Sequence, residues 1–260
     1  MRRIYQRGMS SGFDMLPRTP LVIKRLLWIN FILWFVFAVA FATRSAAGVS
    51  IFRWLSLAPA VFLRGAIWQP VSYMFLHDPG GLWHVVLNLF ALWMFGGTLA
   101  RDWGDRRFLH FYLICGAGAG LVDVVARIMT GSAHVPTIGA SGAVLAVVTA
   151  FAVTYPNTPI LVSFILPVPA WVIAVGYAAI NLLGAVQDFS RGGNPSGTAF
   201  TVHLAGMALG FYFVRRRAGL PSLPSWDFEA RRRERKLRRA RQKFEVYMRK
   251  RDDDHDPWVQ

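Results

Sequence analysis

Long apolar runs alternate with shorter polar segments along the chain. Each run is close to the roughly 20 residues that a helix needs to cross the hydrocarbon core of a bilayer. The first run is expected to be a retained anchor, not a removed signal peptide. The pattern predicts an all-α polytopic membrane protein with six membrane-spanning helices. The runs extend over about residues 22–43, 81–99, 108–128, 138–155, 170–186 and 198–214.

A longer segment, residues 47–80, separates the first two predicted helices. It is rich in apolar and aromatic residues, but Pro59, Pro70 and Pro79 interrupt it. Proline inside a helix removes a hydrogen bond and clashes with the preceding turn, so this segment cannot form another spanning helix. We expect short elements at the outer face of the membrane, where tryptophan and tyrosine are favoured.

Charge orients the predicted helices. The 260 residues are 54% hydrophobic and still carry a formal net charge of +15. Most Lys and Arg residues precede the first run, lie between the second and third runs, or follow the sixth. Basic residues stay on the cytoplasmic side, so both termini are predicted to be cytoplasmic. The expected parts are a cytoplasmic N-terminal tail (1–21), a membrane domain (22–214) and a basic cytoplasmic C-terminal tail (215–260).

The C-terminal tail has two interpretations. A block of charges of this kind usually repels and stays solvated, as an open tail or a polar helix. Leu237, Ala240, Phe244 and Tyr247 recur at helical spacing, however, and would form an apolar stripe on a basic amphipathic helix. Such a helix would lie near anionic lipid headgroups. Nucleic acid is not expected as a partner beside six membrane spans.

Strongly polar side chains are rare inside the predicted helices and are therefore functional candidates. His84 and Asn88 are four residues apart, on one face near the start of the second helix. Ser141 begins the fourth helix, and His203 lies just over one turn into the sixth. With a cytoplasmic N-terminus these three helices all start at the outer face, so the four side chains are expected at a similar depth below it.

Ser141 and His203 have the chemistry of a nucleophile and its base. A serine hydroxyl is a poor nucleophile until a base removes its proton, and a neutral histidine within about 2.6–3.2 Å is the usual base. We therefore predict a catalytic dyad of Ser141 and His203. This pairing requires the fourth and sixth helices to nearly touch.

Four glycines provide small residues for such an approach. Gly206 and Gly210 follow His203 by three and seven residues on the same helix face, and Gly139 and Gly142 enclose the pair that contains Ser141. Small residues are common where membrane helices pack closely, and packing alone would explain all four. The packing and catalytic interpretations are compatible, because helix-packing support from glycine lets the dyad form.

Attack by Ser141 on a carbonyl would create an oxyanion that needs hydrogen-bond donors. The backbone N–H groups at Ser141 are free because it starts a helix, and the side chains of His84 and Asn88 can add donors. No carboxylate is expected to complete a triad. Asp123, the one carboxylate inside a predicted helix, precedes Arg127 by four residues and is interpreted as its ion-pair partner.

The composition indicates no cofactor or metal site. Cys115 is the single cysteine in the sequence, and it lies within a predicted helix. It excludes an intramolecular disulfide and a cysteine-based zinc site.

Three motifs in order resemble those of the rhomboid family of intramembrane serine proteases. They are "HVVLN" at 84–88, "GASG" at 139–142 and "HLAGMALG" at 203–210, with bacterial-like segments at 68–77, 103–113 and 155–170. The resemblance implies a six-helix rhomboid-like bundle with a long interfacial first loop. It also implies a Ser141–His203 dyad, an oxyanion site from His84, Asn88 and the Ser141 backbone, and substrate entry gated by the fifth helix or a capping loop.

Three positions depart from the family pattern. Ala100 stands where many members have glutamate, and Gln69 follows the first-loop tryptophan where some members have arginine. These differences put particular stabilising hydrogen bonds in doubt. Ala146 replaces a frequent glycine on the fourth helix, so slightly looser packing is expected there.

The expected function is that of an intramembrane serine endopeptidase. It would cleave transmembrane segments near the outer, periplasmic face through an acyl-enzyme, with membrane-protein substrates and the lipid bilayer as partners. The resemblance implies a multi-pass protein of the bacterial inner (cell) membrane, and an organelle of bacterial ancestry stays open. A catalytically silent rhomboid-like scaffold is the alternative. A small transporter is disfavoured, because the polar groups gather at one side instead of along a midplane path.

Overall fold

The structure is a computed structural model that describes residues 19–162, 165–190 and 199–216. The predicted amphipathic stripe of the C-terminal tail, Leu237 to Tyr247, lies outside the described residues.

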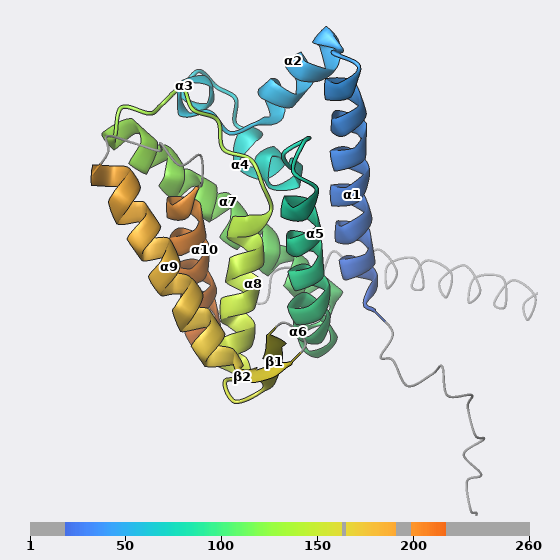
Figure 1. The fold of residues 1–260 in the computed structure, drawn as a ribbon, viewed down its shortest axis with the longest axis vertical. Coiled ribbons are helices and arrows are strands. Elements are labelled where there is room, and N and C mark those ends of the chain that lie inside the picture. The colour runs from blue at the N-terminus through green and yellow to red at the C-terminus, as the bar shows by residue number, and fades with distance from the viewer. Residues whose placement is uncertain (1–18, 163–164, 191–198, 217–260) are drawn as a thin grey trace, which may run out of the picture. The chain divides into compact units, whose positions relative to one another are not determined.

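Besides the short apolar helix Ala46–Leu55 of the first loop, six apolar helices are present in the described part of the chain (Figure 1). Four are long and apolar enough to cross a membrane: α1 (Leu21–Ala42), the span Leu82–Trp103, α7 (Asp105–Met129) and α9 (Ala170–Ser190). Two are shorter: α8 (Ser141–Thr154) and α10 (Phe200–Arg215). They coincide with the six predicted runs, so the prediction of an all-α polytopic membrane protein is confirmed.

The second span consists of three consecutive pieces. These are α5 (Leu82–Ala91), the π-helical turn η3 (Leu92–Gly96) and α6 (Gly97–Trp103). In the fifth helix the described structure goes four residues beyond the predicted limit of 186, to Ser190. Asp188 is buried in this added turn.

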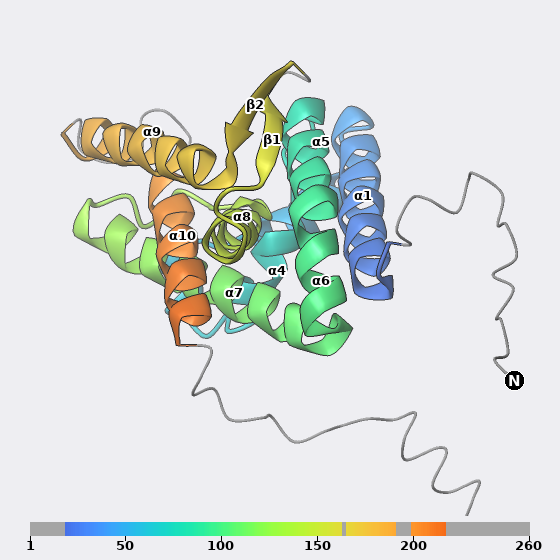
Figure 2. The same ribbon diagram turned by 90° about the horizontal axis from the view of Figure 1, so that it is seen from below.

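Helix α8 is the centre of the bundle. Every residue from Gly142 to Ala152 is buried, because α5, η3, α7, α9 and α10 all pack against it (Figure 2). Helices α1 and α9 instead expose large apolar side chains, among them Trp28, Phe35, Ile180 and Leu183. Such continuous apolar surface is stable against lipid, not against water.

The first loop forms four short elements, as predicted. They are α2 (Ala46–Leu55), α3 (Pro59–Phe62), α4 (Gln69–Ser72) and the 3₁₀ turn η2 (Tyr73–Phe75). Figure 1 shows α2, α3 and α4 at the end of the bundle where α5, α8 and α10 begin. Two loops are tied together here, because Leu57 and Thr137 exchange backbone hydrogen bonds of 3.0 and 2.8 Å. This bridge fixes the chain that leads into α8.

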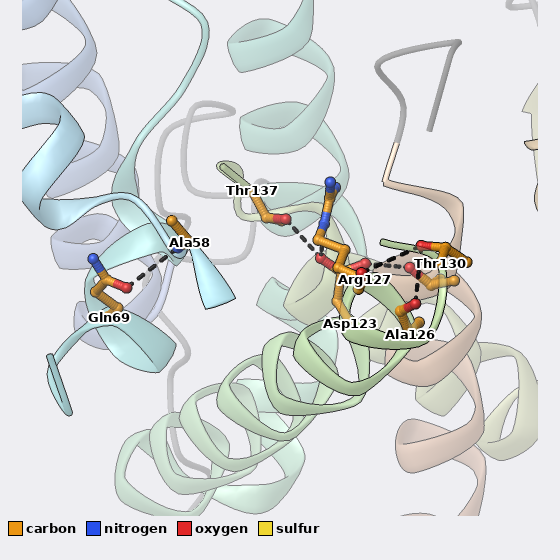
Figure 3. A network of polar contacts seen from close by, with 8 residues as sticks. Ala58, Gln69, Asp123, Ala126, Arg127, Thr130 and Thr137 are labelled. Carbon is orange, nitrogen blue, oxygen red and sulfur yellow. Dashed lines mark hydrogen bonds and ion pairs between the residues drawn. The ribbon is translucent and has the colours of Figure 1, made fainter. Parts of the chain in front are cut away.

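Gln69 stabilises the first loop from inside. Its side chain is fully buried, with Oε1 accepting a hydrogen bond of 3.2 Å from the Ala58 N–H (Figure 3). Its Nε2 donates to the Trp54 carbonyl at 3.2 Å. A buried amide whose donor and acceptor are both used is stabilising. This chain therefore holds the first loop with a buried amide.

The segment between α8 and α9 lies between two of the predicted apolar runs. It forms an antiparallel hairpin of β1 (Pro159–Val162) and β2 (Leu166–Pro169), in which Pro159 faces Pro169. The prolines obscured this hairpin, because proline usually interrupts strands. Proline is tolerated at strand ends and edges, and both strands of a two-stranded sheet are edges. The hairpin follows the end of α8 that is remote from Ser141 (Figure 1).

Candidate active site

Ser141 is the first residue of α8. Its helix begins directly after Ala140, so the backbone N–H groups of the first turn have no partner within the helix. The preceding loop is held in place, since the Gly139 N–H donates a hydrogen bond of 3.0 Å to the Tyr73 carbonyl. The serine hydroxyl is therefore fixed beside unpaired donors and the positive end of the helix dipole.

His203 lies in the first turn of α10, with its ring beside Ser141. Its Nε2 is 2.8 Å from the Ser141 Oγ, a hydrogen-bond distance. The structure thus brings together the two residues that the sequence suggested as nucleophile and base. Both side chains are half-buried.

Glycine permits the close approach of α8 and α10. A Cβ atom on Gly206 would lie 2.1 Å from the Gly142 carbonyl oxygen, and one on Gly210 would lie 2.5 Å from the Ala146 oxygen. A Cβ on Gly142 would lie 2.6 Å from Val202. All three distances are far below van der Waals contact, so the two backbones meet directly. Ala146 faces Gly210, whose missing side chain lets α10 approach the backbone of α8 here.

Gly139 differs from the other three glycines. It lies in the loop directly before α8, outside the contact between α8 and α10. Its φ of +119° is a conformation that side-chain-bearing residues rarely adopt. A Cβ there would also lie 3.2 Å from the His84 Cε1. Gly139 therefore provides the backbone turn into Ser141 and the space for the ring of His84.

His84 and Asn88 occupy different places around this serine. The His84 ring lies beside Gly139: a Cβ atom on that glycine would lie 3.2 Å from His84 Cε1 and 3.5 Å from Ser141 Oγ. Asn88 is buried one turn farther along α5, and its Nδ2 donates to the His84 carbonyl at 2.8 Å. A hydroxyl, a histidine nitrogen and N–H donors thus lie in one site, the set of groups that acyl transfer uses.

Asp123 joins three elements near this site. Its Oδ2 accepts hydrogen bonds of 2.6 Å from Arg127 Nε and Thr137 Oγ1 (Figure 3). Its Oδ1 accepts one from Thr201 Oγ1. The predicted ion pair with Arg127 is confirmed. The sequence did not show that the same carboxylate also holds the loop before Ser141 and the start of α10, because the threonines are far away along the chain.

Asn181 is a residue of the site that the sequence reasoning missed. It is only 4% exposed in α9, and its Oδ1 lies 2.7 Å from the His203 Nδ1. The signal was present, since a strongly polar amide stands inside the apolar run 170–186.

The remaining histidines are separate from the dyad. His77 is fully buried in the first loop, His110 lies in α7, and His134 is exposed in the loop before α8. In the described residues, no three His, Cys, Asp or Glu side chains gather as metal ligands would. His255 lies outside the described residues.

Comparison with known proteins gives consistent matches. The model of the Rhomboid domain matches residues 64–217. The chain is similar to the human Presenilin-associated rhomboid-like protein, mitochondrial, with 28% identity over 136 residues, covering 51% of this chain and 34% of the relative.

Two other relatives come from yeast and a plant. Rhomboid protein 1, mitochondrial, of Saccharomyces cerevisiae is 32% identical over 134 residues, which cover 50% of this chain and 37% of the relative. RHOMBOID-like protein 12, mitochondrial, of Arabidopsis thaliana is 26% identical over 161 residues, which cover 57% of this chain and 46% of the relative. The matched region therefore spans between a third and a half of the length of these relatives.

Proposed function

This chain belongs to the rhomboid family, and from that premise we propose that it is an intramembrane serine endopeptidase with a Ser141–His203 dyad. The single observation that carries the proposal is the 2.8 Å distance between Ser141 Oγ and His203 Nε2. Membership in a family of intramembrane proteases supports the reaction class, and the geometry supports these two residues.

The reaction proceeds through an acyl-enzyme. His203 Nε2 takes the proton of Ser141 Oγ as the oxygen attacks the scissile carbonyl, and it then passes that proton to the leaving amine. A water molecule, deprotonated by the same nitrogen, releases the acyl group and restores the hydroxyl. The oxyanion of each tetrahedral intermediate accepts hydrogen bonds from the Ser141 backbone N–H and from His84 and Asn88. One such donor typically contributes about 100- to 1,000-fold in rate.

The substrate is a transmembrane segment that unwinds near the outer face. A carbonyl within an intact helix is hydrogen-bonded and covered, so Ser141 cannot reach it. Residues that favour helix poorly, such as glycine, serine and proline, make local unwinding easier. Water reaches Ser141 through polar groups that open toward the outer face, since such groups are tolerated at that depth only beside a wet cavity.

The proposed topology follows from the charge distribution. Residues 1–21 and 215–260 are cytoplasmic tails around a membrane domain of 22–214, and the basic C-terminal tail lies near anionic headgroups. The host membrane is the bacterial inner membrane or, because the relatives above carry mitochondrial names, a mitochondrial membrane of bacterial ancestry. The outer face is then the side on which α5, α8 and α10 begin.

Cleavage of a model single-pass substrate by purified protein in detergent tests this function. The wild type should cleave a substrate with glycine and alanine near its outer boundary, and Ser141→Ala should lose more than about 1,000-fold in kcat/KM. The matched control is Ser132→Ala, which removes a hydroxyl from the loop before α8 and should keep normal activity. A serine-directed fluorophosphonate should label the wild type and Ser132→Ala only.

Two outcomes contradict the proposal. If Ser141→Ala cleaves as fast as the wild type, another group is the nucleophile. If the wild type neither cleaves nor reacts with the fluorophosphonate, the chain is the catalytically silent scaffold, which binds membrane clients without hydrolysing them.

A further inference from the structure

Asn181 approaches the candidate active site from the side of His203 opposite Ser141. The two ring nitrogens of His203 are both occupied: Nε2 lies 2.8 Å from Ser141 Oγ, and Nδ1 lies 2.7 Å from Asn181 Oδ1. Three helices, α8, α10 and α9, thus contribute one side chain each to a continuous chain of hydrogen bonds.

A second hydrogen bond of Asn181 determines which of its atoms faces the ring. Its Nδ2 donates to the Tyr177 carbonyl, one turn earlier in α9, at 2.8 Å. A backbone carbonyl can only accept, so the amide nitrogen must point toward Tyr177 and the amide oxygen toward His203. Burial of Asn181 keeps water from competing for either contact.

This orientation selects the tautomer of His203. The Asn181 oxygen only accepts hydrogen bonds, so the proton of a neutral ring must be on Nδ1. A neutral imidazole carries a single N–H, and Nε2 is therefore a free acceptor facing the Ser141 hydroxyl. The contact to Asn181 thus leaves at Nε2 the lone pair that a general base requires.

We propose that Asn181 is the positioning residue of the dyad, holding His203 in the Nδ1–H tautomer and fixing its ring toward Ser141. This inference rests on the proposed function. An amide performs the task without a buried charge, because it accepts the hydrogen bond of the ring in both its neutral and its protonated state. Asn181 acts through His203 and does not touch the substrate.

Substitution of Asn181 by Leu, a side chain of similar size, should lower kcat about 10- to 100-fold, because a misoriented base typically has an effect of that size. KM should change little. The matched control is Asn30→Leu in α1. Asn30 is also buried, and it also donates to a carbonyl one turn earlier, Leu26, at 2.7 Å. Asn30→Leu should leave kcat close to that of the wild type.

Asn181→Asp separates positioning from simple packing. The carboxylate keeps the acceptor toward Nδ1, so activity at alkaline pH should return to within about tenfold of the wild type. Its charge favours the protonated ring, so the acid limb of the pH–rate profile should move to higher pH. The groups that act electrostatically on His203, His84 of α5 and Asp123 of α7, are unchanged in this variant. If Asp and Leu are equally inactive at every pH, Asn181 only fills space and the proposal fails.

The tautomer can be measured without any cleavage. Histidine labelled with ¹⁵N in the detergent-solubilised full chain, with His203 identified by the signal lost in His203→Gln, should show a protonated Nδ1 and an unprotonated Nε2. In Asn181→Leu the Nδ1–H signal should diminish in favour of Nε2–H. A wild type with Nε2–H, or an Asn181→Leu spectrum identical to the wild type, overturns the inference. If the tautomer is as expected but the wild type does not cleave, the proposed function fails and the assigned contact stands.

Discussion

At the scale of residues, a second histidine lies beside His84 of the candidate oxyanion site. His77 is fully buried, and its ring centroid is 5.3 Å from that of His84. Burial, and secondly the proximity of His84, lowers the pKa of His77 to about 3. His77 is therefore neutral in the folded protein and adds no positive charge beside the ring of His84.

The lowered pKa of His77 predicts an acid-sensitive fold. An unfolded histidine titrates near pH 6.5, so below that value the unfolded chain binds a proton that the folded chain excludes. The contribution of His77 to stability should be constant above about pH 6.5 and fall by up to about 1.4 kcal/mol per pH unit as the pH is lowered toward 3. Thermal unfolding of the detergent-solubilised protein between pH 8 and pH 4.5 measures this.

Comparison of variants assigns the effect to His77. His77→Gln should reduce the slope of Tm against pH, whereas His134→Gln, at an exposed loop position, should leave the wild-type slope unchanged. Parallel curves for the wild type and His77→Gln would show that another group is responsible.

At the scale of elements, the pair α8 and α10 determines whether the dyad exists. They form the most extensive helix contact in the described structure, and two glycines of α10 meet the backbone of α8 directly. Asp123 secures the same arrangement from α7, because it binds Thr137 before α8 and Thr201 at the start of α10. Helices α8 and α10, which carry the nucleophile and the base, are thus held both by their direct contact and by Asp123.

Gly206→Ala should separate the two helices. The added Cβ would overlap the Gly142 carbonyl, so α10 must shift, with a loss of about 1–3 kcal/mol in stability and about 100-fold in kcat/KM. Gly176→Ala is the matched control, because a Cβ at this position of α9 meets no atom within 4 Å. It should be neutral or slightly stabilising. An active, stable Gly206→Ala protein would contradict the role assigned to this contact.

The elements also show what the sequence could predict. Apolar length and polar breaks identified the six helices, since lipid imposes one length and one pattern on every span. The hairpin at residues 159–169 was not predicted, because its strands are short and contain prolines. At the site, Ser141 and His203 were predictable from their polarity within apolar runs, their chemistry and the direction of their helices. The contact of Asn181 with His203 and the threonine partners of Asp123 were not, because a single sequence does not tell which side chains of separate elements meet.

At the scale of the whole molecule, membrane orientation decides where the candidate site opens. The helix starts that bear His84, Ser141 and His203 meet at one end of the bundle, together with the first loop (Figure 1). The turn from α6 to α7 lies at the other end and carries Arg101, Arg106 and Arg107. Basic residues at that end favour its retention in the cytoplasm.

Labelling of single added cysteines tests this orientation. The native Cys115 is 1% exposed and should react little with a membrane-impermeant maleimide. His134→Cys should be labelled in intact spheroplasts of an expression host, whereas Asp102→Cys should be labelled only after permeabilisation. Both positions are exposed in the structure. The reverse pattern would place the candidate site on the cytoplasmic side.

The glycine contact between α8 and α10 also bears on how such a chain diverges. Loss of the Ser141 hydroxyl or the His203 ring abolishes the proposed hydrolysis but leaves the helices in place, whereas a side chain at Gly206 forces them apart. A lineage that turned from cleaving its clients to merely holding them would therefore change the dyad freely while its glycines stayed under selection. Descendants with an intact glycine pair and an altered serine or histidine would be evidence of such a change in function.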